Sequence, residues 1–476
     1  MTSEDKKPET EEEINEADNV NQSPQDDDPV YGISDDQIND IEEALHIGYE
    51  DALVEHIYQL SPADAAELIS KVSDEDRDLL LTEHAHAFPP FFFLYLDPDL
   101  RKLALENMTP EEIAAIISEL DSDDALDLIH NLKPEFQSDV IQKLSAKNRL
   151  TLEEGLSFPE DSAGRMMQRE FVAIPQFWTV GKTIDYLRAA SANLPTDFFD
   201  IFVISPTYHV IGEIPLSRIL RSERSQKMEE LKLETLFTIP ATMDQENVAH
   251  VFKRQNLISA PVVDSEDRLI GVITIDDVVD VIDEEAQEDI LKLGGVEKGD
   301  LYRAVMSTTG SRFKWLFVNL ITAIIASAVI SLFDATLQQM VAVAILMPIV
   351  ASMGGNAGTQ ALTVAVRALA TRELSGVNAL RIIWKETIVG FLNGAAFAII
   401  MGLIAGFWFS NSILGGVIAT AMIVNLIVAG LFGAGIPILL NRMGSDPAVS
   451  STVFLTTVTD VIGFLVFLGL AAMFLV

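Results

Sequence analysis

The pattern of apolar and polar positions changes once along the chain. Up to about residue 300, apolar side chains recur in short amphipathic stretches between charged ones, whereas from Phe313 onwards they form long, almost uncharged runs. A run of about 20 apolar residues is long enough to cross a bilayer as a helix. The sequence therefore predicts a soluble part followed by a membrane domain over residues 301–476. The five expected spans lie near 313–333, 338–366, 387–409, 413–440 and 448–476.

Basic residues alternate between the two ends of these spans. Arg303, Arg312 and Lys314 precede the first span, no basic residue lies between the first two spans, and the next basic residues follow the second span. Since basic loops are retained on the cytoplasmic side of a membrane, this alternation predicts a cytoplasmic soluble part and a carboxyl terminus outside. Residues 1–28 contain no basic start followed by an apolar core, so we expect no cleavable signal peptide.

Residues 33–160 contain a repeat with a period of 12 residues. In most units an apolar residue is followed by Ser, Thr or Asp, then by Pro or an acid, and then by apolar residues, which is the pattern of a capped amphipathic helix. Short helices that repeat in this way predict an α-helical solenoid. The units begin at Leu60, Val72, Leu96, Met108, Leu120, Leu132 and Leu144, and the slot at His84 departs from the pattern.

The slot at His84 also contains His86, and a pair of histidines can indicate a metal site. Side chains at i and i+2 diverge on a helix, however. The pair is therefore better explained as a break in the repeat than as a set of metal ligands.

Two similar segments follow the solenoid. Residues 202–220 (FVISPTYHVIGEIPLSRIL) align with residues 261–279 (PVVDSEDRLIGVITIDDVV) at an offset of 59, and each segment has the pattern of a β-α-β-β-α unit. This duplication resembles a tandem pair of CBS domains, over residues 163–225 and 226–283. The resemblance implies a pseudo-twofold disc that in many families binds adenosyl nucleotides. Because such discs commonly pair, it also implies a homodimer.

The soluble part is strongly acidic. Residues 1–300 contain 66 acidic and 24 basic side chains, a net charge of −42, whereas residues 301–476 have a net charge of +3. Such a field repels nucleic acid and attracts cations, so we expect no nucleic-acid partner and consider cation sensing. Residues 1–32 combine acidic charge with very few apolar side chains and are predicted to be a disordered tail.

An acidic linking helix is predicted between the CBS pair and the first span, over residues 276–300. Asp277, Asp280 and Glu284 follow one another at spacings of three and four residues and therefore lie on one side of it. Like charges so close destabilise a helix, and Mg²⁺, which binds through a few oxygens while keeping several waters, would relieve their repulsion. An ordinary solvated acidic face is the alternative.

A single aspartate lies in the middle of the last apolar run. Asp460 is the one charged residue within residues 448–476. A carboxylate at mid-membrane costs about 3 kcal/mol even on the gentler insertion scales, so it should face a bundle interior or a watery path, with a cation as its partner. Thr452, Thr456 and Gly463 share its helix face by their spacing, which suits a pore lining. A polar residue that only joins helices, or one held protonated, is the alternative.

The second span contains residues that are unusual at membrane depth. Its segment 347–360 (MPIVASMGGNAGTQ) includes a proline, three glycines and Asn356. A broken helix is tolerated in lipid only where its freed backbone groups line a cavity or are buried in protein. Close packing of small residues explains the glycines, but less easily Asn356, Thr359 and Gln360 together. The segment is therefore predicted to be a broken helix that forms a pore wall.

The order of these features resembles the MgtE family of bacterial magnesium channels. The solenoid, the CBS pair, the acidic linking helix, GGNAGTQ and TDVIGF follow one another over about residues 33–476. The resemblance implies that two chains form one pore in the plasma membrane, between their second and fifth spans, and that Asp460 binds the hydrated ion. The residues that it implies along the ion path are Asp460, Thr456, Thr452, Asn356 and Gly355.

The resemblance also implies regulation. The linking helix would act as a plug that is held shut by Mg²⁺, and ATP would be a regulatory ligand of the CBS pair. The acids that it implies around the regulatory Mg²⁺ are Asp277, Asp280, Glu285, Glu288 and Asp289. High internal Mg²⁺ would then neutralise the acidic soluble part and shut the pore, because an ion favours the state that binds it better.

The expected protein is thus a multidomain α plus α/β membrane protein, with a cytoplasmic α-helical solenoid, a tandem CBS pair, a linking (plug) helix and a five-helix transmembrane domain. Its expected function is Mg²⁺-selective uptake down the electrochemical gradient. A membrane-anchored CBS sensor of nucleotides or divalent cations is the alternative, and it would need neither Asp460 nor the unusual second span. An enzyme is not expected, because the chain has no cysteine and no phosphate loop, and its seven histidines lack a triad-like setting.

Overall fold

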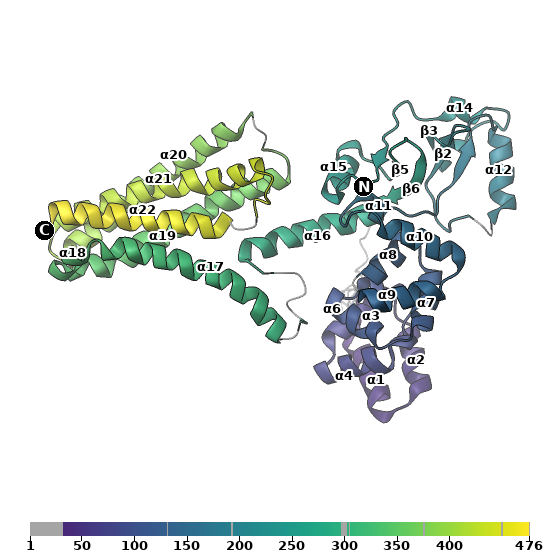
Figure 1. Cartoon of the computed structure of the whole chain (residues 1–476), viewed down its shortest axis with the longest axis horizontal. Helices are drawn as coiled ribbons and strands as arrows, with labels where there is room; N and C mark the ends of the chain where they lie inside the picture. Colours follow the sequence, from purple (N-terminus) through teal and green to yellow (C-terminus); the bar gives the residue numbers. More distant parts are fainter. Residues whose placement is uncertain are drawn as a thin grey trace, which may run out of the picture. The chain divides into compact units, whose positions relative to one another are not determined.

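The computed structural model describes residues 32–130, 132–191, 194–296, 302–303, 305–374, 377–448 and 451–475 (Figure 1). The chain forms two compact units, residues 1–277 and residues 278–476. The disordered tail expected for residues 1–32 lies outside the described residues, apart from Gly32.

The first unit begins with short helices that follow the 12-residue repeat. Alternate helices pack on one another, since α7 contacts α9 and α8 contacts α10. The departure at His84 is confirmed: His84 ends α4, and a single 3-10 turn follows. The elements are α1 (Asp35–Ile47), α2 (Glu50–Tyr58), α3 (Pro62–Lys71), α4 (Asp74–Glu83), η1 (Ala85–Ala87), α5 (Phe92–Tyr95), α6 (Pro98–Glu106), α7 (Pro110–Glu119), α8 (Ser122–His130), α9 (Pro134–Lys143) and α10 (Ala146–Leu156).

The hydroxyl and carboxylate residues of the repeat cap these helices as the sequence predicts. Ser61, Ser73 and Ser145 each accept the N–H of the third helical residue, at 3.1–3.2 Å. Thr109 forms a complete capping box on α7, because its hydroxyl accepts the N–H of Glu112 while the Glu112 carboxylate accepts the N–H of Thr109. Each cap satisfies an amide that the first turn of a helix leaves without a partner.

Two three-stranded sheets follow, each with one parallel and one antiparallel pair, in the orders β1-β2-β3 and β4-β5-β6. The first repeat contains α11 (Ala163–Met166), β1 (Ala173–Pro175), α12 (Val180–Ala189), β2 (Asp200–Ile204), β3 (Val210–Pro215) and α13 (Leu216–Leu220). The second contains α14 (Met228–Leu231), β4 (Ile239–Pro240), α15 (Gln245–Gln255), β5 (Ser259–Val263) and β6 (Leu269–Thr274).

The two sheets confirm the offset of 59 in detail. Asp200 pairs with Pro215 and Ser259 pairs with Thr274, and the register of each hairpin shifts at the equivalent position. Each hairpin turn also has a residue with positive φ, Tyr208 in the first repeat. The equivalent residues Asp200 and Ser259 meet, since the Ser259 hydroxyl donates to the buried Asp200 carboxylate at 2.8 Å. The duplicated sequence therefore folds as a pseudo-symmetric pair.

The linking helix α16 (Ile275–Gly294) continues directly from β6. It ends where the glycine pair predicts, because Gly295 follows with φ of +67° and its N–H bonds the Lys292 carbonyl. Residues 297–300 of the expected linking segment lie outside the described residues.

Within the described residues of the second unit, five helices are long and apolar enough to cross a membrane, as predicted. In Figure 1 they run alongside one another, and α21 contacts α19, α20 and α22. The spans are α17 (Val305–Ser331), α19 (Val341–Ala370), α20 (Ala379–Trp408), α21 (Ser412–Arg442) and α22 (Ser451–Phe474), with the short helix α18 (Asp334–Gln339) between the first two.

The prediction of a broken second span is wrong. Helix α19 is continuous over 30 residues, with Pro348 inside it. Lipid favours a helix that keeps its backbone hydrogen bonds, and the glycines permit close packing instead of a break. Gly358 shows this, because a Cβ built there would lie 2.9 Å from the Leu455 side chain of α22.

Removing the Thr109 cap should loosen the start of α7. We expect Thr109→Ala to cost about 1 kcal/mol, since the hydroxyl that accepts the Glu112 N–H is lost, and to speed amide exchange in the first turn of α7 about fivefold. Hydrogen–deuterium exchange on the full chain measures this. Thr82→Ala is the matched control, because the Thr82 hydroxyl bonds only the Asp78 carbonyl of its own helix. Equal exchange in both variants would contradict the prediction.

Candidate functional site

The polar positions of α22 form one ladder along the helix. Thr452, Thr456 and Asp460 lie four residues apart and are all half-buried. The Thr456 hydroxyl donates to the carbonyls of Thr452 and Val453, at 3.0 and 3.1 Å, so it is held by its own helix. Among the described residues, nothing forms a hydrogen bond or ion pair with the Asp460 carboxylate. A carboxylate in the middle of a span therefore has no partner within this part of the chain.

The exposed face of α19 is polar along most of the span. Ser352, Asn356, Thr359 and Thr363 recur at spacings of four, three and four residues, and all are exposed in the single chain. The Thr359 hydroxyl donates to the Gly355 carbonyl at 2.9 Å, and a Cβ built at Gly355 would meet no described residue within 4 Å. Polar side chains at this depth cannot face lipid without cost. The face is therefore suited to a watery path or a second protein surface.

The buried faces of these two helices are closely packed and combine large apolar side chains with glycines. Gly354 of α19 and Gly463 of α22 both lie against Asn425 of α21. Gly463 was expected to line a pore together with Asp460, and the structure places it against Asn425 of α21. The glycine points inwards instead, because only a residue without a side chain leaves room for the Asn425 amide there.

The end of the linking helix contacts the start of α22 within the second unit. The Lys292 ammonium binds the Asp446 carboxylate at 2.8 Å and also binds Glu288. The Thr452 hydroxyl donates to the Leu293 carbonyl at 3.3 Å. Burial and the nearby Asp446 charge raise the pKa of Asp289. Thr452 therefore belongs both to the polar ladder of α22 and to the contact with α16.

The start of the linking helix lies in an acidic cluster of the first unit, which comprises Asp121, Asp123, Asp124, Asp276 and Asp277. The pKa of Asp277 is raised to about 7, mainly by burial and to a smaller extent by the charge of Asp276. Burial and the charges of Asp277 and Asp124 raise the pKa of Asp123 well above its usual range. The Asp123 Oδ1 atom is shut off from solvent and has no hydrogen-bond partner among the described residues. Burial and the neighbouring carboxylates therefore disfavour the charged forms of Asp123 and Asp277.

The predicted regulatory acids are distributed between the two units. Asp277 belongs to the acidic cluster, Asp280 is exposed, and Glu285, Glu288 and Asp289 are half-buried near the other end of α16. Within the described ranges, no three His, Asp or Glu side chains converge closely enough to hold one ion.

Sequence reasoning did not single out Asp123, Asp124, Asp446 or Asn425. The two cluster acids look like the first-turn acids of any repeat unit. Asp446 could have been recognised in the sequence, because it is one of only five acids after residue 300. Asn425 could also have been recognised, since it is an amide in the middle of an apolar span.

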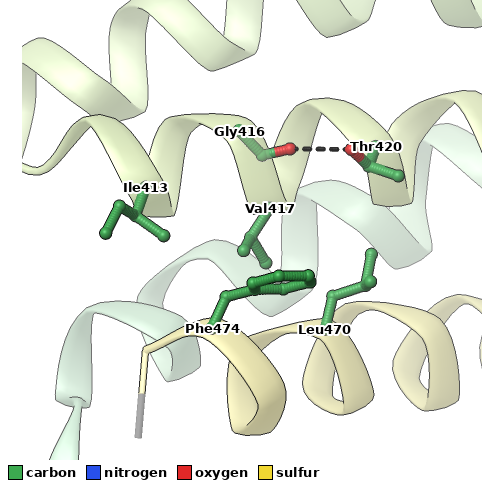
Figure 2. A pocket seen from close by; sticks show the side chains of 6 residues that line it. All are labelled: Ile413, Gly416, Val417, Thr420, Leu470 and Phe474. Carbon is green, nitrogen blue, oxygen red and sulfur yellow. Dashed lines mark hydrogen bonds between the residues drawn. The ribbon is translucent and has the colours of Figure 1, made fainter.

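A cavity of about 280 Å³ lies between α21 and α22 (Figure 2). Ile413, Val417, Leu470 and Phe474 point into it, and the Thr420 hydroxyl is held by the Gly416 carbonyl at 2.9 Å. It offers no charged group to a cation, and it does not include Asp460 or Asn356.

Models of known protein families match segments of both units. The family model described as a divalent cation transporter matches residues 347–470, the MgtE intracellular N domain matches residues 60–161, and a CBS domain matches residues 229–284. The magnesium transporter MgtE of Thermus thermophilus is 31% identical over 445 residues, which cover 91% of this chain and 98% of that protein. The chain belongs to the MgtE family. The family resemblance inferred from the order of motifs is therefore confirmed.

Other members of the MgtE family are similar over comparable lengths. The magnesium transporter MgtE of Bacillus subtilis is 28% identical over 420 residues, which cover 88% of this chain and 93% of that protein. Among solved structures, the cytosolic domain of the Mg²⁺ channel MgtE in complex with ATP is 27% identical and has a TM-score of 0.47; the match covers 51% of this chain and 99% of that one. The soluble part of a magnesium transporter is 24% identical and has a TM-score of 0.45; the match covers 53% of this chain and 98% of that one.

The raised pKa of Asp277 predicts a pH dependence of stability. Its carboxyl holds a proton in the folded chain up to about pH 7, but an unfolded aspartate releases it near pH 4. The free energy of unfolding should therefore fall as the pH rises from about 4 to about 7, and level off above that. Asp277→Asn should reduce this slope, which thermal unfolding of the full chain without divalent ions measures.

Asp267→Asn is the matched control for this measurement. Asp267 lies in an exposed turn with φ of +58°, a conformation that asparagine also adopts readily. The control should keep the slope of the unmodified chain. An unchanged slope in Asp277→Asn would show that this carboxyl is not the group that titrates.

Proposed function

We propose that this protein is a Mg²⁺-selective channel of the bacterial plasma membrane, which takes up Mg²⁺ down its electrochemical gradient and is closed by cytosolic Mg²⁺. The observation that carries the proposal is Asp460, an acid in the middle of α22 without a partner among the described residues, in a member of the MgtE family. A cation is the partner that such a carboxylate requires. The relatives named magnesium transporters support Mg²⁺ as that cation.

The ion path follows the polar faces of α19 and α22. Asp460 attracts the ion, and Thr452, Thr456, Asn356 and the Gly355 backbone offer oxygens to its water shell. Mg²⁺ gives up its waters reluctantly and keeps several of them when it binds. Selectivity would therefore come from the spacing of these oxygens around a hydrated ion, because full dehydration is not required.

A homodimer completes this path. The exposed polar face of α19, from Ser352 to Thr363, lies at membrane depth and would meet lipid if the chain acted alone. A second copy related by a twofold axis would cover it with the same face. The two copies would then enclose a path with polar walls and one Asp460 from each chain.

Regulation uses the acids at both ends of α16. The acidic cluster offers the carboxylate oxygens that Mg²⁺ prefers, and the Asp123 Oδ1 atom has no protein partner among the described residues. Mg²⁺ bound there would supply positive charge to the cluster. Asp277, Asp280, Glu285, Glu288 and Asp289 would hold the regulatory ions together with Asp123.

The contacts at the end of α16 connect this charge to the pore. Thr452 binds the Leu293 carbonyl, and Lys292 binds Asp446 just before α22. A change in the position of α16 would therefore alter the first turn of the helix that carries Asp460. With the cluster neutralised, α16 stays against α22 and the path is shut; repulsion among the free carboxylates releases it.

The first unit is proposed to lie in the cytoplasm, and the CBS pair is proposed to bind a nucleotide. The basic residues that follow α19 and α21 support a cytoplasmic first unit and an external carboxyl terminus, as does the match to an intracellular N domain. ATP is proposed as a regulatory ligand, since tandem CBS folds commonly bind adenosyl nucleotides. No catalytic residue is assigned. A membrane-anchored sensor is less favoured, because it gives no role to Asp460.

Neutralising the mid-membrane acid should stop transport. We expect Asp460→Asn to reduce Mg²⁺ uptake by about 100-fold or more, because the charge that offsets the cost of bringing a divalent ion into the membrane is removed. Uptake into liposomes that contain the purified protein measures this. Asp334→Asn is the control; Asp334 is an exposed acid of α18 that binds Gln338 at 2.7 Å. Uptake by Asp460→Asn at the rate of the control would refute the role of Asp460.

Neutralising the linking helix should leave the channel open. We expect the triple change Asp277→Asn, Asp280→Asn and Glu285→Gln to keep uptake at millimolar Mg²⁺ on the soluble side, where the unmodified protein is shut. The reason is that the carboxylates that favour the closed, ion-bound state are lost. The matched control replaces three exposed acids of α1 and α2, Asp36, Glu43 and Glu55, by their amides. Normal closure of the triple variant would place the sensor elsewhere in the chain.

A further inference from the structure

A buried amide lies where three of the membrane helices meet. Asn425, near the middle of α21, is completely buried between α19 and α22. Removing an amide from water without satisfying its hydrogen bonds costs on the order of 2–7 kcal/mol. A residue of this kind in an otherwise apolar helix therefore needs a structural or functional reason.

The orientation of this amide is fixed by its partner. The Asn425 Nδ2 atom donates to the Val350 carbonyl of α19 at 2.8 Å. A carbonyl can only accept, so the nitrogen must face Val350, and Oδ1 is the atom left over. That Oδ1 atom is buried and has no hydrogen-bond partner among the described residues. One hydrogen bond thus joins α21 to α19, and the carbonyl oxygen of the Asn425 amide does not take part in it.

Glycines of both pore-lining helices accommodate the amide. A Cβ built at Gly463 of α22 would lie 2.9 Å from Asn425 Nδ2, and one at Gly354 of α19 would overlap the same atom. The carboxamide therefore fills the gap between α19 and α22 at one level of the membrane. Gly463 lies three residues after Asp460, and Gly354 lies two residues before Asn356.

We propose that Asn425 is a positioning residue for the ion path, which holds α19 and α22 in the register that sets Asn356 opposite the Asp460 ladder. The inference rests on the proposed function, because it assigns those two faces to the path. Asn425 touches no ion, since it is fully buried; it acts by fixing the helices that carry the oxygens. A polar residue that merely joined two helices would need its hydrogen bond, but not a missing Cβ on both neighbours.

The first test uses a double-mutant cycle. Asn425→Leu and Gly354→Ala should each reduce Mg²⁺ uptake about 10–100-fold and lower the ratio of Mg²⁺ to Ca²⁺ uptake, as loss of the groups that orient metal ligands does elsewhere. Asn425→Ala should reduce uptake as well, because it loses the hydrogen bond to Val350, and in the double variant with Gly354→Ala the two losses should be less than additive. The smaller side chain makes room for the added methyl group, so this non-additivity reports on the contact specifically.

Two controls come from the same helix. A Cβ at Gly435 would meet nothing within 4 Å among the described residues, so Gly435→Ala should leave uptake and the ion ratio unchanged. Thr420→Ala removes a hydroxyl whose bond stays inside α21, and should also have no effect. These controls separate a general sensitivity of α21 from the role of Asn425.

The second test measures register without transport. The chain contains no cysteine, so the pair Gly358→Cys and Leu455→Cys places the only two thiols of the chain where α19 and α22 touch. Disulfide formation between them demands a narrow range of separations and angles. With Asn425 present the disulfide should form readily in the membrane, and Asn425→Leu should slow it at least about tenfold.

The experiments test the channel function and the positioning role of Asn425 separately. Uptake and ion ratio unchanged in Asn425→Leu and in Gly354→Ala would overturn the positioning role while leaving the channel in place. Absence of uptake in the unmodified protein would refute the proposed function, and the disulfide rates alone would then judge the register. An unchanged disulfide rate in Asn425→Leu would overturn the positioning role in that case as well. If Asn425→Leu does not fold, Asn425→Ala, Gly354→Ala and the non-additivity of their double variant give the same decision: unchanged uptake in both single variants would overturn the positioning role.

Discussion

An acid in the middle of a membrane-spanning helix is the constraint on which the rest of the second unit depends. Asp460 cannot face lipid at an acceptable energy, and the described part of the chain gives it no partner. The polar face of α19 and the ladder on α22 are consistent with a watery surface at the same depth. Glycines on the inner faces let both helices pack closely against Asn425 of α21. The cost of exposing Asp460 to lipid thus explains the polar outer faces, and close packing explains the inner glycines.

The acidic first unit provides the second half of the account. Helix α16 carries Asp277 of the acidic cluster in its first turn and contacts Thr452 and Asp446 at its other end. The raised pKa values of Asp123 and Asp277 show that the charged forms of these carboxylates are unfavourable, and a bound cation would offset that cost. Because a single helix carries acids at both ends, the charge state of the first unit and the start of α22 can be linked by ordinary binding equilibria.

Much of this organisation could be predicted from the sequence, because periodic patterns encode it. The 12-residue repeat, the duplication at an offset of 59 and the five spans correspond to α3–α10, to the two sheets and to the helices of the second unit. The errors concern glycine. Glycines in α19 suggested a break and Gly463 suggested a pore face, yet Gly354, Gly358 and Gly463 pack against neighbouring helices, because sequence spacing cannot tell which neighbour occupies the space. Asp123 and Asn425 were missed since their roles depend on contacts with distant segments.

The most direct test of the account is Mg²⁺ uptake by the unmodified protein in liposomes, with Mg²⁺ varied on the side of the first unit. The account predicts uptake when that side contains little Mg²⁺, and loss of uptake when it reaches millimolar concentration. Uptake that ignores Mg²⁺ on that side would remove the regulatory half of the account. No uptake at any concentration would contradict its central claim that Asp460 serves an ion path.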